Sequence, residues 1–290
     1  MADLGLRPLT LGEVLDRTFS LYRKHFLLFA GITAIPQLLV LALRLCQTFV
    51  VTGPRWTAAR PPSARLESDT STTILTFVVL AIVGFVVYVV AYLFAQGGTV
   101  FAVSELYLGR PTTIAASLGR MRGQLGSLFG VVLLNGLAVI AGLFCLIAPG
   151  IYVACRLIAC VPAALLEDLG PIDSLERSYS LTRGFAGRSF LIYLLYFVLL
   201  YGAVFLFALP FSVAMVFAAK NPSMMPIWLS LTQVGEFIAN VLVVPILTIA
   251  TAVFYYDLRV RKEAFDLQVM LDPNDPLAAQ GPSIVPRTLF

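Results

Sequence analysis

Six long runs of apolar residues, each almost free of charge, set the limits on what this chain can fold into. They cover residues 26–50, 73–96, 125–147, 151–166, 188–219 and 227–258. About 20 apolar helical residues are needed to cross the roughly 30 Å hydrocarbon core of a bilayer. Lipid offers no hydrogen-bond partner to backbone N–H and C=O groups, so such runs must be helical. The runs therefore predict an all-α, polytopic membrane helical bundle with six transmembrane helices.

The composition agrees with a membrane protein and leaves little for a separate soluble domain. Apolar residues make up 59% of the chain and charged residues 12%, whereas a soluble domain has about 25% charged residues. The longest less apolar stretches are 52–72, predicted as an external loop, and 272–290, predicted as a disordered cytoplasmic tail. We therefore expect a single integral membrane domain over residues 1–271.

Lysine and arginine residues lie mainly in the segments that six crossings would place on one side of the membrane. In that arrangement the N-terminus, the 109–124 link, the 167–188 link and the C-terminal tail share a side. Cytoplasmic segments are enriched in these residues, so both termini are predicted in the cytoplasm. The charged first 24 residues do not resemble a cleavable signal peptide. For 151–166 a second interpretation stays open, because this short run could be a re-entrant hairpin.

A short segment near the N-terminus occurs again later in the chain. Leu15–Arg23 (LDRTFSLYR) is closely similar to Leu175–Arg183 (LERSYSLTR), and Ser117–Arg122 (SLGRMR) is a weaker third copy. Each copy precedes two apolar runs. We therefore predict three pseudo-repeats, each consisting of an interfacial helix followed by a transmembrane hairpin.

The first copy has the pattern of an amphipathic helix that lies in the membrane interface. Its apolar residues fall on one face, while its opposite face is basic, which suits anionic headgroups. Thr10 and Glu13 form a capping-box pattern at its start. In the second copy, Pro171 stands where a helix would begin.

Acidic residues stand at the predicted cytoplasmic ends of the crossings, where they could pair with arginines of the interfacial helices. Two interpretations stay open: ion pairs that hold each interfacial helix in place, or contacts with a headgroup or a substrate. The candidate residues on this face are Arg17, Arg23, Glu105, Arg120, Arg177, Arg183 and Asp257.

Three charged residues, Arg44, Arg156 and Glu236, lie within the apolar runs. Charges inside a membrane are costly and are therefore candidates for function. Counted from the predicted helix ends, all three fall in the outer half of the bilayer, where they could form one polar cluster. They could form a site that opens outward, or an ion pair that holds helices together while the arginines reach toward the surface.

The sequence shows no pattern typical of catalysis. The single histidine, His25, and the four cysteines lack metal-ligand spacing, and neither a serine nucleophile elbow nor a phosphate-binding loop is present. We predict no catalytic residue, no metal, no cofactor and no nucleic-acid partner.

Three stretches, Arg7–Phe26, Ala148–Gly187 and Phe254–Leu267, together resemble the membrane domain associated with bacterial glycerophosphoryl diester phosphodiesterases. The resemblance implies a six-helix, multi-pass domain of the bacterial inner membrane, in a family that is largely uncharacterised. In some members this domain precedes a soluble TIM-barrel phosphodiesterase. Nothing after Phe265 could supply the catalytic histidines and carboxylates of that barrel, so phosphodiesterase activity is not expected here.

These observations favour a non-catalytic membrane module that binds lipids, a partner membrane protein or another copy of itself, for example as an accessory subunit of a larger complex. The alternative is a small transporter or flippase-like protein that uses the charged residues within the membrane. A membrane-embedded enzyme acting on lipid headgroups is the third and least favoured interpretation.

Overall fold

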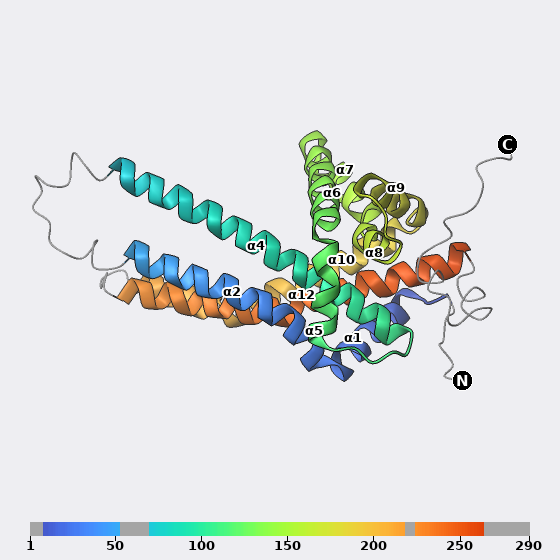
Figure 1. Ribbon diagram of the computed structural model, residues 1–290, viewed down its shortest axis with the longest axis horizontal. Coiled ribbons are helices and arrows are strands. Elements are labelled where there is room, and N and C mark those ends of the chain that lie inside the picture. Colours follow the sequence, from blue (N-terminus) through green and yellow to red (C-terminus); the bar gives the residue numbers. More distant parts are fainter. Residues whose placement is uncertain (1–7, 53–69, 218–223, 264–290) are drawn as a thin grey trace, which may run out of the picture. The chain divides into compact units, whose positions relative to one another are not determined.

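A computed structural model describes residues 8–52, 70–217 and 224–263, and within these ranges the chain forms helices and turns without any strand (Figure 1). Six helical stretches are long and apolar enough to cross a membrane, namely Phe26–Phe49, Val78–Tyr107, Leu125–Cys145, Ile147–Leu166, Ala186–Phe207 and Met225–Glu263. The predicted all-α membrane fold is confirmed. The predicted tail 272–290, and most of the predicted loop 52–72, lie outside the described residues.

Along the chain, short helices precede pairs of longer apolar segments, as the repeats predict. Helix α1 (Leu11–Lys24) precedes α2 (Phe26–Thr52) and α4 (Thr70–Tyr107). Helix α5 (Ile114–Arg120), with the 3-10 turn η2 (Met121–Gly123), precedes α6 (Leu125–Cys145) and the pair α7 (Ile147–Arg156) and α8 (Cys160–Leu166). Helix α9 (Pro171–Leu181) precedes α10 (Ala186–Phe207), α11 (Leu209–Phe217) and α12 (Met225–Glu263).

The start signals read from the sequence are confirmed at α1 and α9. The Glu13 backbone N–H donates to the Thr10 hydroxyl at 3.3 Å, and the Thr10 backbone N–H donates to the Glu13 carboxylate at 2.6 Å. This reciprocal pair satisfies donors that a helix start otherwise leaves without partners. Pro171 is the first residue of α9, where its missing N–H costs nothing.

Two of the apolar runs are not single helices. In the run 151–166, α7 ends at Arg156 and α8 begins at Cys160. In the run 188–219, α10 ends at Phe207 and α11 begins at Leu209. Pro210 lies in the first turn of α11, which is the part of a helix that tolerates the missing N–H of proline. The first of these breaks decides where Arg156 lies.

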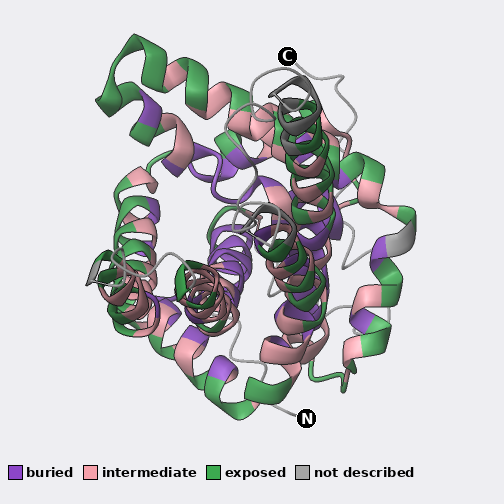
Figure 2. Cartoon of the chain, turned by 90° about the vertical axis from the view of Figure 1, so that its left-hand side faces the viewer, coloured by how far each residue is buried: buried purple, intermediate pink, exposed green. Residues whose placement is uncertain are grey.

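The chain divides into two compact units. Unit 1 comprises residues 1–32, 93–196 and 245–290, and unit 2 comprises 33–92 and 197–244. Unit 1 includes the second half of α12, in which every residue from Thr248 to Val260 is buried. Figure 2 shows buried residues in purple and exposed residues in green. Helix α8 is buried almost as completely. Unit 1 therefore contains both the buried second half of α12 and the buried helix α8.

Unit 2 contains parts of α2, α4, α10 and α12 together with α11. Many of its apolar side chains are exposed, including Leu39, Phe85 and Val198, as expected of helices whose solvent is lipid. At Gly235 of α12 the backbone of Phe207 approaches so closely that a Cβ atom would overlap the Phe207 carbonyl. Small residues at such crossings allow membrane helices to pack tightly.

Candidate functional site

Unit 1 contains a group of charged residues that we call the Glu167 cluster, made of Glu167, Arg177, Tyr255, Arg259 and Glu263. Arg177 Nε donates to Glu167 Oε2 at 2.8 Å, and Arg177 Nη2 donates to Oε1 at 2.9 Å. The Tyr255 hydroxyl donates to Glu167 Oε1 at 2.5 Å. Glu263 pairs with Arg177 and, at 3.2 Å, with Arg259 Nε. The cluster thus joins the end of α8, the interfacial helix α9 and the end of α12.

Burial makes each partner in the Glu167 cluster necessary. The Arg259 side chain is 1% exposed and that of Glu167 is 7% exposed. Buried charges are tolerated only where they are paired and hydrogen-bonded. Burial by itself lowers the pKa of Arg177, but hydrogen bonds to Glu167 and Glu263, and the charges of both, outweigh it and raise that pKa. Two arginines and two carboxylates leave the cluster neutral and fixed.

A second group surrounds Asp257, whose side chain is fully buried. Its carboxylate accepts hydrogen bonds from Arg188 Nη1 at 3.0 Å and from Arg261 Nε at 3.1 Å, and from the Leu9 backbone N–H at 2.7 Å. The same two arginines each donate to the Leu9 carbonyl at 2.5 Å. The segment before α1 is therefore held between the start of α10 and the end of α12.

The remaining candidates on this face have simpler surroundings. Arg120 Nη1 donates to Glu105 Oε1 at 2.5 Å, with the Arg120 side chain 57% exposed. Arg17 donates to the Tyr107 hydroxyl at 3.1 Å, and its guanidinium lies 5.1 Å from the centre of that ring. Arg23 and Arg183 are exposed. The structure thus pairs Glu105 with Arg120 and Glu167 with Arg177, whereas Asp257 has partners that the sequence did not indicate.

Several members of these two groups were missed by the sequence analysis. They are Arg188, Tyr255, Arg259, Arg261 and Glu263. Part of the signal was present, because Asp257 with Arg261 and Arg259 with Glu263 have the spacing of four residues that favours ion pairs on a helix. The contacts of Arg188 and of the Leu9 backbone leave no such local pattern.

In unit 2, Arg44 Nη1 lies 3.2 Å from Glu236 Oε2, with side chains 45% and 41% exposed. Two glutamines of the same unit bind other helices: Gln47 donates to the Leu80 carbonyl at 2.8 Å, and Gln233 donates to the Thr48 hydroxyl at 2.8 Å. These contacts join α2 to α4 and to α12.

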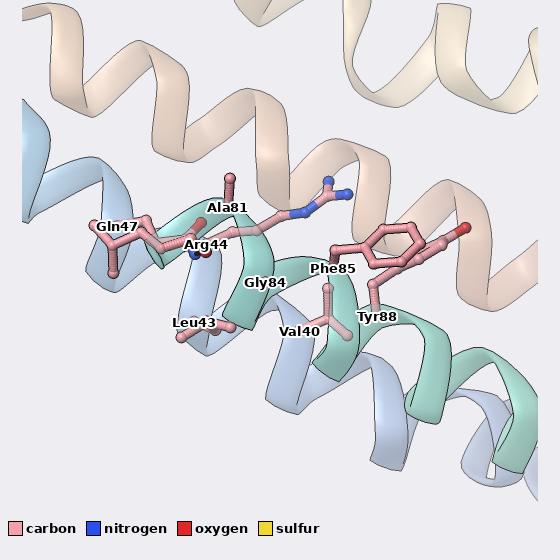
Figure 3. A pocket seen from close by; sticks show the side chains of 9 residues that line it. Val40, Leu43, Arg44, Gln47, Ala81, Gly84, Phe85 and Tyr88 are labelled. Carbon is pink, nitrogen blue, oxygen red and sulfur yellow. Dashed lines mark hydrogen bonds between the residues drawn. The ribbon is translucent and has the colours of Figure 1, made fainter. Parts of the chain in front are cut away.

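A cleft of about 240 Å³ lies beside this ion pair, between α2 and α4. Figure 3 shows Arg44 and Gln47 of α2 near Gly84, Phe85 and Tyr88 of α4. Most of the residues that line the cleft are apolar, and its volume is below the roughly 300–1,000 Å³ typical of small-molecule sites.

Arg156 has other neighbours, all of them in unit 1. Its Nη2 donates to the Tyr179 carbonyl at 2.5 Å, and its guanidinium lies 3.9 Å from the centre of the Tyr179 ring. The Arg156 carbonyl accepts hydrogen bonds from the hydroxyls of Ser178 and Thr182. The predicted depth of Arg156 in the membrane assumed an unbroken helix over residues 151–166. That depth does not apply, because α7 ends at Arg156 and the residue contacts α9, the predicted interfacial helix.

The described residues include no group of three or more histidine, cysteine, aspartate or glutamate side chains that could hold a metal ion. Comparison of the chain with known protein families, with characterised proteins and with solved structures finds no match. The resemblance to the phosphodiesterase membrane domain therefore stays a prediction.

Proposed function

We propose that this chain is a non-catalytic membrane module whose basic face in unit 1 binds anionic lipid headgroups or the acidic surface of a partner membrane protein. One observation carries the proposal. The carboxylates at the helix ends, Glu105, Glu167 and Asp257, are engaged in internal ion pairs with arginines. Other basic residues of the same unit are exposed: Arg23, Lys24, Arg110, Arg183 and Lys262.

The amphipathic helices support this proposal. Helix α1 has its acidic residues, Glu13 and Asp16, in its first half and ends in Arg23 and Lys24, so its last turn carries the positive charge that a helix C-terminus favours. A basic face next to apolar spans attracts anionic lipids with about 1 kcal/mol for each lysine or arginine near the surface. Location in the bacterial inner membrane, which the resemblance to the phosphodiesterase membrane domain implies, belongs to the same proposal. So do the cytoplasmic termini, which the distribution of lysine and arginine supports.

The test is the thermal midpoint of the purified full chain in a neutral maltoside detergent. We expect mixed micelles with phosphatidylglycerol to raise the midpoint above that in phosphatidylcholine, and added salt to reduce the gain because salt screens exposed charges. Replacing Arg23 and Lys24 together by Gln should lower the gain. The matched control replaces Arg60 and Arg65, in the predicted external loop, by Gln. An equal effect from both pairs would contradict the proposal.

A second candidate function is transport through unit 2. It is favoured by the Arg44–Glu236 ion pair within apolar helices and by the cleft beside it. Ionisable residues inside a membrane often mark a substrate or ion pathway. Uptake of a charged solute into proteoliposomes that wild-type protein supports, and that a folded Glu236→Ala variant does not, would favour this function over the first.

A further inference from the structure

Arg156 is a buried charge without a carboxylate. The residue is 4% exposed, and its Nε is buried without a hydrogen-bond partner. Among the described residues, no carboxylate lies within ion-pair distance of Arg156. A guanidinium keeps its charge at any ordinary pH, so burial of this kind calls for a compensating anion.

The groups that contact Arg156 compensate only part of its charge. They are the Tyr179 carbonyl and the faces of the Tyr179 and Tyr152 rings, the latter 5.9 Å away. Aromatic faces attract a cation, and the C-terminal end of a helix such as α9 carries about half a negative charge. Together, these groups can partly compensate the charge of one cation.

Two further cations lie at the same end of α9. Lys262 Nζ donates to the Ser180 carbonyl at 2.6 Å, one residue after the carbonyl that Arg156 contacts. The Arg183 backbone N–H also donates to the Ser180 carbonyl, at 3.4 Å. Both Arg156 and Arg183 lie near enough to repel the charge of Lys262, which Glu263 attracts. Three positive charges therefore gather around the last turn of one helix.

Glu263 and Glu167 are already engaged in ion pairs. Glu263, next to Lys262 in sequence, pairs with Arg177 and Arg259, and Glu167 pairs with the same two arginines. Those four charges sum to zero. None of the three cations at the end of α9 forms an ion pair with a carboxylate among the residues that the structure describes.

We propose that Arg156, Arg183 and Lys262 form a binding site for a phosphate group. Arg183 and Lys262 are exposed and would contact the phosphate oxygens, while Arg156 behind them would add its fixed charge. Phosphate oxygens are strong acceptors for guanidinium and ammonium donors. The inference rests on the proposed function, because it names one site within the basic face. The phosphate could belong to a phospholipid headgroup or to a small soluble phosphate.

The experiment measures the thermal midpoint of the full chain in neutral detergent during two titrations at constant ionic strength. One uses inorganic phosphate, and the other uses phosphatidylglycerol in phosphatidylcholine micelles. We expect a saturable rise, and a double variant Arg183→Gln/Lys262→Gln should need about tenfold more ligand for each side chain removed. The matched control, Arg60→Gln/Arg65→Gln in the predicted external loop, should leave the half-saturating concentration unchanged. Saturation by inorganic phosphate would identify a soluble ligand, and saturation by the lipid alone would identify a headgroup.

A third variant, Arg156→Met, separates binding from folding. Because this change removes an uncompensated buried charge, we expect a midpoint without ligand at least equal to that of the wild type, together with weaker phosphate binding. A fall in the ligand-free midpoint would overturn the role given to Arg156.

Equal half-saturation in both double variants would overturn the site while leaving a general preference for anionic lipid intact. Saturation that depends on Arg183 and Lys262, without any wider preference for phosphatidylglycerol, would support the site and contradict the proposed function. No response to either ligand would overturn both.

Discussion

In unit 1, Glu167 and Asp257 each contact two arginines, whereas in unit 2 Glu236 is paired with Arg44 alone among the charged residues that the structure describes. The two carboxylates of unit 1 are almost completely buried, but that of Glu236 is 41% exposed. Among these three carboxylates, the two that are more buried have more arginine partners. A charge that cannot move outward needs every neighbour it has, whereas a half-exposed pair can separate and turn away.

The two units also differ in what links their helices. In unit 1, ion pairs connect the ends of different helices, joining α8 to its neighbour α9 and to the distant α12. In unit 2, close backbone approach at Gly235 accompanies one ion pair. We therefore expect unit 1 to be sensitive to loss of charge and unit 2 to be sensitive to added volume. Three substitutions test this comparison.

The largest effect is expected for Glu167→Gln in unit 1. The change removes the carboxylate shared by Arg177 and Arg259 and leaves buried positive charge, which costs about 3–5 kcal/mol in other proteins. The measurement is the free energy of unfolding in mixed micelles titrated with sodium dodecyl sulfate. The control is Glu176→Gln, an exposed residue of α9, which should change stability by less than about 0.5 kcal/mol. A similar loss from both variants would show that net charge, and not the cluster, matters.

A smaller effect is expected for Gly235→Leu in unit 2. The new side chain would meet the backbone of Phe207 and Ala208, and overpacking of this kind typically costs about 1–3 kcal/mol. The same unfolding titration measures it. Gly202→Leu is the matched control, because an added Cβ at Gly202 meets nothing nearby. If Gly202→Leu were equally destabilising, added apolar bulk alone would explain the loss.

The smallest effect is expected for Glu236→Gln, one residue further along α12. Its partner Arg44 is half exposed, and pairs of this kind contribute less than about 1 kcal/mol. If loss of charge alone decided stability, Glu236→Gln would be more destabilising than Gly235→Leu. We expect the reverse order. A loss as large as that of Glu167→Gln would remove the distinction between the two units.

The interfacial helices show which features of the candidate site can be predicted from the sequence. Arg17 and Arg177 occupy equivalent positions in two copies of the repeat, and the pattern around them predicted helices at both. Their partners differ, since Arg17 contacts the Tyr107 hydroxyl and Arg177 contacts two carboxylates. The pairing of Glu167 with Arg177 was within reach of the sequence, because ten residues and one turn separate them. The part played by Arg259 was not, because its neighbours come from another part of the chain.

Hydropathy and its period determined the all-α membrane fold, the six apolar segments and the start of α1, because these depend on residues close together in the chain. Only the tertiary structure decided that Leu9 meets Asp257, 248 positions away, and that the break after Arg156 turns this residue toward α9. Such contacts depend on how helices end and pack against one another. A buried charge takes whichever partner that packing brings within reach, and its own sequence neighbours do not specify which one.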